Sequence, residues 1–313
     1  MKKQIKSFEL VLIGHPDKIC DLVSKTICEQ NPLGRNAIEC VWGNKLFTVN
    51  GETDNSFTDH KLSVLVKNVL SDVGLTEDEL KIITVVNNLN IQSPEINKIV
   101  GDQGTGDNGI YFGGYNKIYS PVIAKMKDLC SALTANVLRE WGYRTDGKFI
   151  FNVDKFGKIV DLTINVAKNK DRKVEPENLI EFIKTFTGTD TVVTVNPKGD
   201  WSKCYAFADC GLTGRKLACD GACGLFSHGG GAMFGKDISK ADVTVPLYLS
   251  YLAERFIGRK KEVGFSAASI IGDKELDVYR NGKFYESIPF AVMKAYVRGK
   301  ELDVFGVLRD SNK

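Results

Sequence analysis

The sequence predicts an α+β protein built from three similar units. Alternating apolar residues on either side of turn-forming residues predict β-hairpins, and apolar residues at helical spacing follow each hairpin. This order of hairpin and helix occurs three times, near 37–73, 148–186 and 262–297. Because the intervals are similar, the pattern indicates a threefold-repeated α+β architecture, although the three stretches share no residue-level repeat.

The composition is that of a soluble globular protein. The chain has 313 residues, of which 43% are hydrophobic and 26% are charged, so it is long enough for one large domain or two to three small ones. A formal net charge of +3 is too small to predict nucleic-acid binding. The basic N-terminus lacks an apolar core, and no apolar run approaches membrane-spanning length, so we expect a cytoplasmic protein without a membrane partner. The scattered cysteines are expected to be reduced thiols.

The N-terminal part begins with a strand and a helix that meet at a histidine. The apolar stretch 8–13 predicts the strand, and Pro16 suits the first helical turn, where its missing N–H costs nothing. His15 and Asp17 therefore lie at a helix N-terminus, which favours anions. The next predicted elements are a hairpin over 37–49, a helix over 58–73, a short helix with the capping box Thr76-x-x-Glu79, and a strand over 81–89.

The stretch 92–115 is polar and rich in glycine, and it is predicted to be a lid or binding loop. Regular patterns resume after it. The later predicted elements are a helix over 121–141, a hairpin over 148–167 turned at Phe156–Gly157, a helix over 176–186, a strand over 191–195, a helix over 241–257 with Pro246 in its first turns, a hairpin over 262–281 and a helix over 289–297.

The stretch from Asp209 to Asp242 combines cations with glycines. Its cations are Arg215, Lys216, Lys236 and Lys240, and its glycines include residues 229–231 and 235. Glycines let backbone N–H groups approach an anion closely, and the cations supply the charge that an extended polyanion needs. An aspartate such as Asp242 can hold the divalent metal that accompanies a polyphosphate. Because Asp237 follows Gly235–Lys236, this is not a Walker A loop, and the stretch predicts a polyphosphate site outside the common nucleotide folds.

Several segments, in the same order along the chain, resemble motifs of the S-adenosylmethionine synthetases (methionine adenosyltransferases). They are G-H-P-D-K-I at 14–19, Q-S-P-E-I-N at 92–97, D-C-G-L-T-G-R-K at 209–216, and H-G-G-G-A at 228–232 with G-K-D at 235–237, Lys240 and Asp242. The resemblance spans roughly residues 8 to 300. It implies three α+β domains about a pseudo-threefold axis, with approximate ranges 1–98, 113–205 and 206–313, a mobile active-site loop at 99–112, and strands interleaved between domains.

The resemblance implies a reaction in two parts. The methionine sulfur attacks C5′ of ATP and expels tripolyphosphate, which is then cleaved to phosphate and pyrophosphate. Because a thioether is a weak nucleophile and the leaving group is highly charged, catalysis should come from in-line positioning and charge neutralisation. The implied cofactors are Mg²⁺, with two ions per site, and K⁺. The implied assembly is a homo-oligomer, a dimer or tetramer, with sites at the subunit interface.

Residue roles follow from the resemblance position by position. His15 would stabilise the leaving oxygen chain, and Lys158 would lie near the reacting centre. The implied tripolyphosphate clamp is Arg215, Lys216, Lys236 and Lys240, with Arg215 most closely tied to cleavage. The implied ATP and adenine contacts are Trp201, Asp209, Ile271 and Lys236. The implied methionine contacts are Glu9, Glu52, Gln92, Asp107, Asp209 and Lys240. The implied metal ligands are Asp17 and Asp242 for Mg²⁺ and Glu39 for K⁺.

Some positions depart from the family's pattern. Ile13 stands where the family usually has a glutamate, and Phe156 stands where an aspartate contacts the ribose, with Asp154 as a nearby substitute. Both G-D-Q-G at 101–104 and G-D-N-G at 106–109 fit one family motif. We prefer the register that uses Asp107, because the residues after it also match, and Asp102 is the alternative.

These departures leave two rival functions. The first is an ATP or tripolyphosphate hydrolase that has kept the cation clamp and lost methionine selection. The second is an inactive regulatory subunit, which would be expected to have lost clamp residues. Because all four clamp cations are present in the sequence, the active synthetase is the preferred interpretation.

Overall fold

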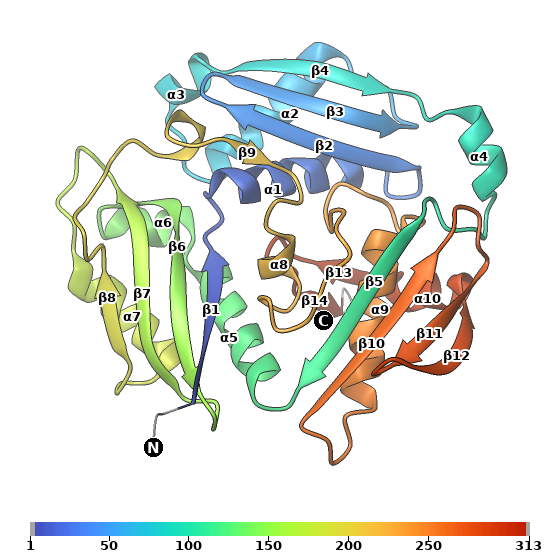
Figure 1. Cartoon of the computed structure of the whole chain (residues 1–313). Coiled ribbons are helices and arrows are strands. Elements are labelled where there is room, and N and C mark those ends of the chain that lie inside the picture. The colour runs from blue at the N-terminus through green and yellow to red at the C-terminus, as the bar shows by residue number, and fades with distance from the viewer. Residues whose placement is uncertain (1–3, 311–313) are drawn as a thin grey trace.

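The computed structural model describes residues 4–310 and contains three four-stranded β-sheets arranged around a common centre (Figure 1). In this view the sheets lie at the left, the top and the right. The three hairpins predicted from the sequence, near 37–49, 148–167 and 262–281, each belong to a different sheet. The predicted fold of three similar α+β units is therefore confirmed.

The sheet on the left joins the N-terminal strand to the middle of the chain. Its order is β1 (Ile5–Val11), β6 (Tyr143–Asp154), β7 (Ile159–Lys168) and β8 (Val192–Val195). Its helices are α5 (Tyr119–Ala132), α6 (Ala135–Glu140) and α7 (Pro176–Thr187). Alternate residues of β6, such as Phe149 and Phe151, are buried in the core of this unit. Because Val11 pairs with Lys148, the residues that follow β1 lie beside the first residues of β6.

The sheet at the top carries the helix that begins after Pro16. Its order is β4 (Thr84–Asn90), β3 (Leu46–Thr53), β2 (Asn36–Gly43) and β9 (Gly211–Leu212). Its helices are α1 (Pro16–Glu29), α2 (Asp59–Asp72) and α3 (Glu77–Lys81). Ile19, Val23 and Ile27 recur at helical spacing and are fully buried in one core with the inner residues of β2. Strand β9 pairs with β2 and thereby brings the segment after Asp209 onto α1.

The sheet on the right is mainly C-terminal. Its order is β12 (Lys283–Pro289), β11 (Glu275–Arg280), β10 (Glu262–Ser269) and β5 (Gly109–Asn116). Helix α9 (Ala241–Arg255) packs across β5 and β10, and Pro246 lies in its first turns as predicted. Helix α10 (Phe290–Val297) contacts α9. Strand β12 and the final hairpin of β13 (Lys300–Leu302) and β14 (Leu308–Asp310) were not predicted.

Two stretches differ from their predictions. The predicted loop over 92–115 contains α4 (Pro94–Val100) and most of β5, so only 92–93 and 101–108 are irregular. Proline at the first helical position explains why a helix begins there. The predicted helix over 121–141 is two helices, because Leu133 leaves the helical conformation and the Thr134 side chain caps α6.

The sheets exchange strands between distant parts of the chain. Strand β1 joins the sheet of the middle region, β5 joins the C-terminal sheet, and β9 joins the N-terminal one. The linear domain ranges stay a prediction, because a division by sheets cuts across each of them. Within residues 4–310, no helix is long and apolar enough to cross a membrane. The cytoplasmic location also stays a prediction.

Candidate functional site

His15 is the N-cap of α1, which begins between the left and the top sheets (Figure 1). Its Nδ1 accepts a hydrogen bond from the Asp17 N–H at 3.2 Å. Burial, and next the positive charge of Lys216, lower the pKa of His15 to about 4. The imidazole is therefore neutral at physiological pH, and the proton resides on Nε2 because Nδ1 is the acceptor. His15 offers an uncharged N–H donor beside a helix N-terminus.

Asp17 is fully buried and holds two cations. Arg215 Nε lies 2.9 Å from Oδ1, and Lys216 Nζ lies 2.5 Å from Oδ2. The Leu212 N–H also donates to Oδ1 at 2.9 Å. Burial alone would raise the pKa of Asp17, but the hydrogen bond and charge of Lys216 outweigh burial and lower it. One carboxylate is thus shared by two cations at a helix N-terminus, which leaves this point with a positive surplus.

The turn that carries these two cations packs against the glycine-rich segment 229–235. Gly214 has a φ of +81°, and a Cβ there would lie 2.9 Å from the Gly231 oxygen. Gly231 has a φ of +76°, and a Cβ on it would lie 2.4 Å from Asp242 Oδ2. Both positions therefore require glycine, because a side chain would separate the two segments.

Asp242 and Lys236 form the ion pair of this glycine-rich segment. Lys236 Nζ lies 2.6 Å from Asp242 Oδ2, and the Ala232 N–H donates to the same oxygen at 3.2 Å. Lys236 reaches the site through an isolated β-bridge with Ala37, beside the start of β2. The Lys236 side chain is 16% exposed and that of Asp242 is 20% exposed, so this ion pair lies largely within the wall of the site.

A second group gathers around Lys240, the N-cap residue of α9. Lys240 Nζ lies 3.4 Å from Glu52 Oε1, and a Cβ on Gly106 would lie 3.2 Å from Lys240 Cδ. The parallel pairing of β3 with β4 aligns Glu52 with Asn90, so Gln92 follows at the same edge of the sheet. Gln92 is 2% exposed, and its Oε1 has no hydrogen-bond partner among residues 4–310. A buried acceptor of this kind needs a partner, either an ordered water or a ligand group that enters beside it.

Asp107 and Ile271 lie in adjoining turns. The Asp107 backbone carbonyl accepts a hydrogen bond from the Ser269 hydroxyl at 2.9 Å, and the Ile271 N–H donates to Asn108 Oδ1 at 2.7 Å. Asp107 follows Gly106, which packs against Lys240. Asp102, the alternative register, is exposed like Asp107, and its carbonyl accepts a hydrogen bond from Lys294. The register that uses Asp107 stays a prediction.

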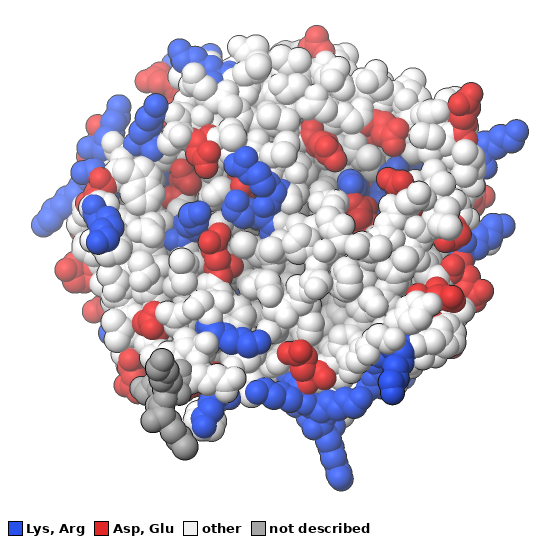
Figure 2. Space-filling model, viewed as in Figure 1, with Lys and Arg blue, Asp and Glu red and all other residues white. Residues whose placement is uncertain are grey.

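We name the first group the His15 cluster and the second the Lys240 cluster. The His15 cluster is His15, Asp17, Asp209, Arg215 and Lys216, and the charge of Asp209 acts on His15. The Lys240 cluster is Glu52, Gln92, Asp107, Lys236, Lys240 and Asp242. Figure 2 shows lysine and arginine side chains next to acidic ones in the middle of the face seen in Figure 1.

The remaining predicted residues lie apart from both clusters. Lys158 is 59% exposed and pairs with Asp190, at the far end of β6, about 20 Å along the strand from Lys148. Glu39 lies on the exposed face of β2. Trp201 packs against the core of the top sheet, and its carbonyl accepts the Lys168 N–H. Glu9 lies opposite Ile150 in the β1–β6 ladder.

Asp146 and Lys148 were missed by the sequence analysis. The positive charge of Lys148 lowers the pKa of His15. Asp146 Oδ2 accepts the Tyr205 N–H at 2.7 Å, and burial raises the pKa of Asp146 to about 6. The alternation of T-D-G-K at 145–148 was the available signal, because it places Asp146 and Lys148 on one face of β6.

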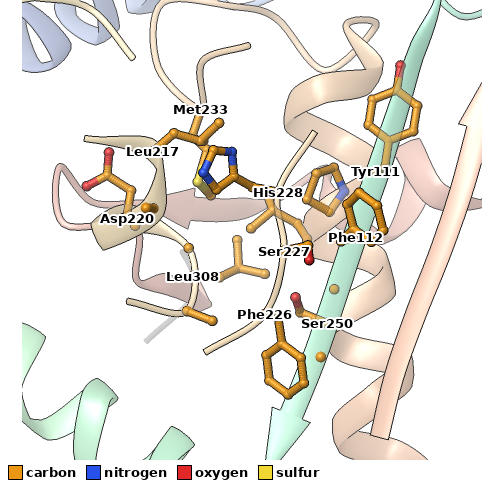
Figure 3. Close-up of a pocket in the computed structure, with 18 of the residues that line it drawn as sticks. Tyr111, Phe112, Leu217, Asp220, Phe226, Ser227, His228, Met233, Ser250 and Leu308 are labelled. Carbon is orange, nitrogen blue, oxygen red and sulfur yellow. The ribbon is translucent and has the colours of Figure 1, made fainter. Parts of the chain in front are cut away.

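A cavity of about 370 Å³ lies behind the glycine-rich segment (Figure 3). Aromatic side chains such as Tyr111, Phe112 and Phe226 line it together with Met233 and His228. The volume suits a small ligand. His228, which the sequence places in a glycine-flanked turn like that of His15, therefore faces this cavity and not the His15 cluster.

Comparison with known proteins gives consistent results. Residues 3–94 match the family described as "S-adenosylmethionine synthetase, N-terminal domain", and residues 205–272 match its C-terminal domain. An S-adenosylmethionine synthase of Mycoplasmopsis pulmonis is 32% identical over 292 residues, which cover 83% of this chain and 75% of that protein. One of Corynebacterium urealyticum is 30% identical over 303 residues, covering 82% and 75%. A solved structure described as an unusual S-adenosylmethionine synthetase from Campylobacter jejuni has a TM-score of 0.73 at 22% identity, covers 94% of this chain and 85% of its own, and speaks for the fold alone.

Proposed function

Because this chain belongs to the S-adenosylmethionine synthetase family, we propose that it is a methionine adenosyltransferase acting on ATP and L-methionine. The observation that supports this most is the pairing of Arg215 and Lys216 with one buried carboxylate at the N-terminus of α1. A helix N-terminus with surplus positive charge suits a polyphosphate leaving group.

The residues of the His15 cluster account for departure of tripolyphosphate. In our proposal the methionine sulfur attacks C5′ in line with the leaving oxygen, and the neutral His15 donates its Nε2–H to the oxygen chain. Arg215 and Lys216 neutralise the developing charge, and Lys236 approaches from the glycine-rich segment. Fixed donors aimed at developing charge are worth about 2.7–4 kcal/mol each. The same cations then hold tripolyphosphate while water cleaves it, with Arg215 serving this second step.

The Lys240 cluster supplies a complementary set of groups for methionine. In our proposal the Glu52 and Asp107 carboxylates and the Gln92 Oε1 accept hydrogen bonds from the amino group, while Lys240 pairs with the substrate carboxylate. The resemblance also makes Asp209 and Glu9 proposed methionine contacts, although Asp209 belongs to the His15 cluster and Glu9 lies in the β1–β6 ladder. The buried, unpartnered Oε1 of Gln92 is the observation that favours this assignment. For adenine we propose contact with Ile271 and stacking on Trp201.

Mg²⁺ fits the carboxylates that the chain offers. Magnesium is usually held by one or two carboxylates together with substrate phosphates, and Asp17 and Asp242 have the right chemistry. In this structure both are engaged by lysine or arginine, so these cations would move from the carboxylates to the phosphates when Mg²⁺ binds. No group of three or more acidic, histidine or cysteine side chains in residues 4–310 could hold a metal without substrate. When bound, Mg²⁺ supplies additional neutralisation of the phosphates. Glu39 alone does not form a cage for K⁺, so our proposal for that ion requires further oxygen ligands.

We also propose a homo-oligomer with sites at the subunit interface. The top sheet leaves apolar residues on its outer face, including Val41 at 42% exposure and Leu46 at 50%. Exposed apolar patches favour association. A second subunit on this face would lie near Glu39, and either Glu39 or Lys158 would serve the partner's site. Light scattering that gives the mass of a monomer at assay concentrations would rule this out.

One product assay tests the proposed function. Purified protein is incubated with ATP, methionine, Mg²⁺ and K⁺, and the nucleoside and phosphate products are identified together by mass spectrometry. We expect S-adenosylmethionine, phosphate and pyrophosphate. ATP or tripolyphosphate breakdown without S-adenosylmethionine would instead support the hydrolase, and the exposed Phe156 in place of an aspartate would be the first residue to revert. No consumption of ATP would support the inactive subunit.

A further inference from the structure

A buried ion triad lies directly behind the His15 cluster. Lys18 is completely buried, and its Nζ donates to Asp21 Oδ2 at 2.9 Å and to Asp220 Oδ1 at 2.6 Å. Burial alone would lower the pKa of Lys18, but the charges of the two carboxylates outweigh burial and raise it. The ammonium therefore stays charged between two acids that lie far apart in the sequence.

The two acids hold opposite ends of the segment that carries the clamp cations. Asp21 Oδ1 accepts the N–H of Gly214 at 2.8 Å, immediately before Arg215. Asp220 is the last residue of α8 (Leu217–Asp220), and its N–H donates to the Lys216 carbonyl at 2.9 Å. The Lys18 ammonium thus connects both ends of segment 214–220.

Helix α1 supplies both the target of the cations and the anchor of their segment. Asp17 and Lys18 are neighbours, yet Asp17 contacts the cation side chains and Lys18 holds the ends of the segment that bears them. A fully buried triad is costly to desolvate, and well-packed apolar residues often give equal stability. We explain the triad by the position of segment 214–220 and not by stability. Arginine and lysine side chains are long and flexible, so Arg215 and Lys216 can converge on one point only if the backbone that carries them is held in place.

We propose that Lys18 is a positioning residue that fixes segment 214–220, through Asp21 and Asp220, so that Arg215 and Lys216 converge on bound polyphosphate. This inference rests on the proposed function, because it assumes that the His15 cluster binds the tripolyphosphate chain. Lys18 itself touches no substrate. Removing its ammonium should spare methionine binding and weaken polyphosphate binding.

Calorimetric titration with a non-hydrolysable imido analogue of inorganic tripolyphosphate and Mg²⁺ tests this on the full chain, because the proposed second step would cleave tripolyphosphate itself; the affinities below refer to this analogue. We expect Lys18→Met to bind tripolyphosphate at least about 30-fold more weakly than the wild type and to raise KM for ATP, with KM for methionine unchanged within about threefold. The matched control is Arg144→Met, which removes another largely buried cation. Arg144 Nη2 lies 2.7 Å from Glu79 Oε2, and this pair does not contact segment 214–220. We expect it to lower the melting temperature without weakening tripolyphosphate binding by more than about threefold.

The outcomes separate the inference from the proposed function. If the wild type does not bind tripolyphosphate, the proposed function fails, and this inference fails with it. If the wild type binds and Lys18→Met binds equally well, only the positioning role is overturned. Equal weakening in Lys18→Met and Arg144→Met would reduce Lys18 to a general stabilising residue. Should Lys18→Met not fold, Asp220→Asn keeps the Lys18–Asp21 pair, and it is expected to bind about tenfold more weakly; wild-type affinity would overturn the proposal.

Discussion

The His15 and Lys240 clusters use the same residue types in different balance. In the first, Asp17 is fully buried and shared by Arg215 and Lys216. In the second, each lysine has a carboxylate of its own, Lys236 with Asp242 and Lys240 with Glu52. At Asp17 two cations share one carboxylate, and only with the charge of Asp209 is the first cluster balanced as a whole. The second cluster has three carboxylates, Asp107 included, against two lysines, so it is negative by one charge until a substrate or metal engages it.

Burial makes this difference larger. The carboxylate of Asp17 is 0% exposed, whereas that of Glu52 is 32% exposed. Charges in a buried site are weakly screened, and exposed pairs contribute little because water and salt screen them. Both clusters contain two basic residues beside their carboxylates. What differs is how the cations share the carboxylates and how deeply those carboxylates are buried, and this decides which cluster holds its cations in place before substrate arrives.

The largest expected effect comes from removing a cation of the surplus. Lys216→Met should lower kcat/KM for S-adenosylmethionine formation about 1000-fold, which corresponds to about 4 kcal/mol, because a preorganised charge at a developing anion is lost. Initial rates of product formation measure this. The control is Lys125→Met, an exposed lysine on α5, which should keep wild-type rates. A loss below tenfold for Lys216→Met would contradict the proposal that Lys216 neutralises the leaving group.

A smaller loss is expected from the cluster of matched pairs. Lys236→Ala should cut turnover roughly 150-fold, which corresponds to about 3 kcal/mol, because Asp242 alone neutralises Lys236, whereas Lys216 shares Asp17 with Arg215. The same rate assay at saturating Mg²⁺ measures it beside Lys216→Met. If Lys236→Ala loses as much activity as Lys216→Met or more, the ranking of the two clusters is wrong.

Arg215 should separate the two chemical steps. It is the most exposed of the cations in its cluster, with 40% of its side chain accessible, and its guanidinium also bonds the Cys210 carbonyl. Arg215→Leu should slow tripolyphosphate cleavage about tenfold more than S-adenosylmethionine formation, because Lys216 remains to neutralise the first leaving group. Single-turnover measurements of both products give the ratio. Equal slowing of both steps would assign the two cations a common role.

The sequence predicted most elements because their signals are local. The capping box at Thr76 and the proline start of α1 depend on neighbours in the chain, and both are found. Helix α4 was missed although Ile96, Ile99 and Val100 are at helical spacing, because seven residues before a glycine-rich stretch are too few for the pattern to stand out. Strand β12 was missed because it follows β11 after only two residues, so the sequence was interpreted as one strand followed by a loop.

The site was less accessible to sequence reasoning, because its contacts are long-range. The cations and acids of the clamp could be chosen by resemblance, but nothing local shows that Lys216 meets Asp17 or that Lys240 meets Glu52. Asp146 was missed for the same reason, because only the pairing of β6 with β1 brings it near His15. The roles of all these residues stay predictions until the variants are measured.

The smallest expected effect distinguishes two titrating groups beside the surplus charge. The pKa of His15 is about 4, so it stays neutral from pH 5 to 7.5, whereas Asp146, with a pKa of about 6, ionises in this range. An added negative charge near the phosphates should weaken ATP binding as pH rises. The ratio of KM for ATP between the wild type and Asp146→Asn should therefore rise from about 1 at pH 5 to about 5 at pH 7.5.

This ratio is informative because the titration of ATP itself is the same for both proteins and cancels. His15→Asn serves as the control, since asparagine is a good N-cap and leaves Asp146 in place. We expect it to retain the pH dependence of KM that the wild type shows, at a lower rate. A constant ratio for Asp146→Asn, or a pH dependence that disappears in His15→Asn, would make His15 the titrating group. Burial and the charge of Lys216 would then be too weak to keep the imidazole neutral, and the contrast between the two clusters would lose its physical basis.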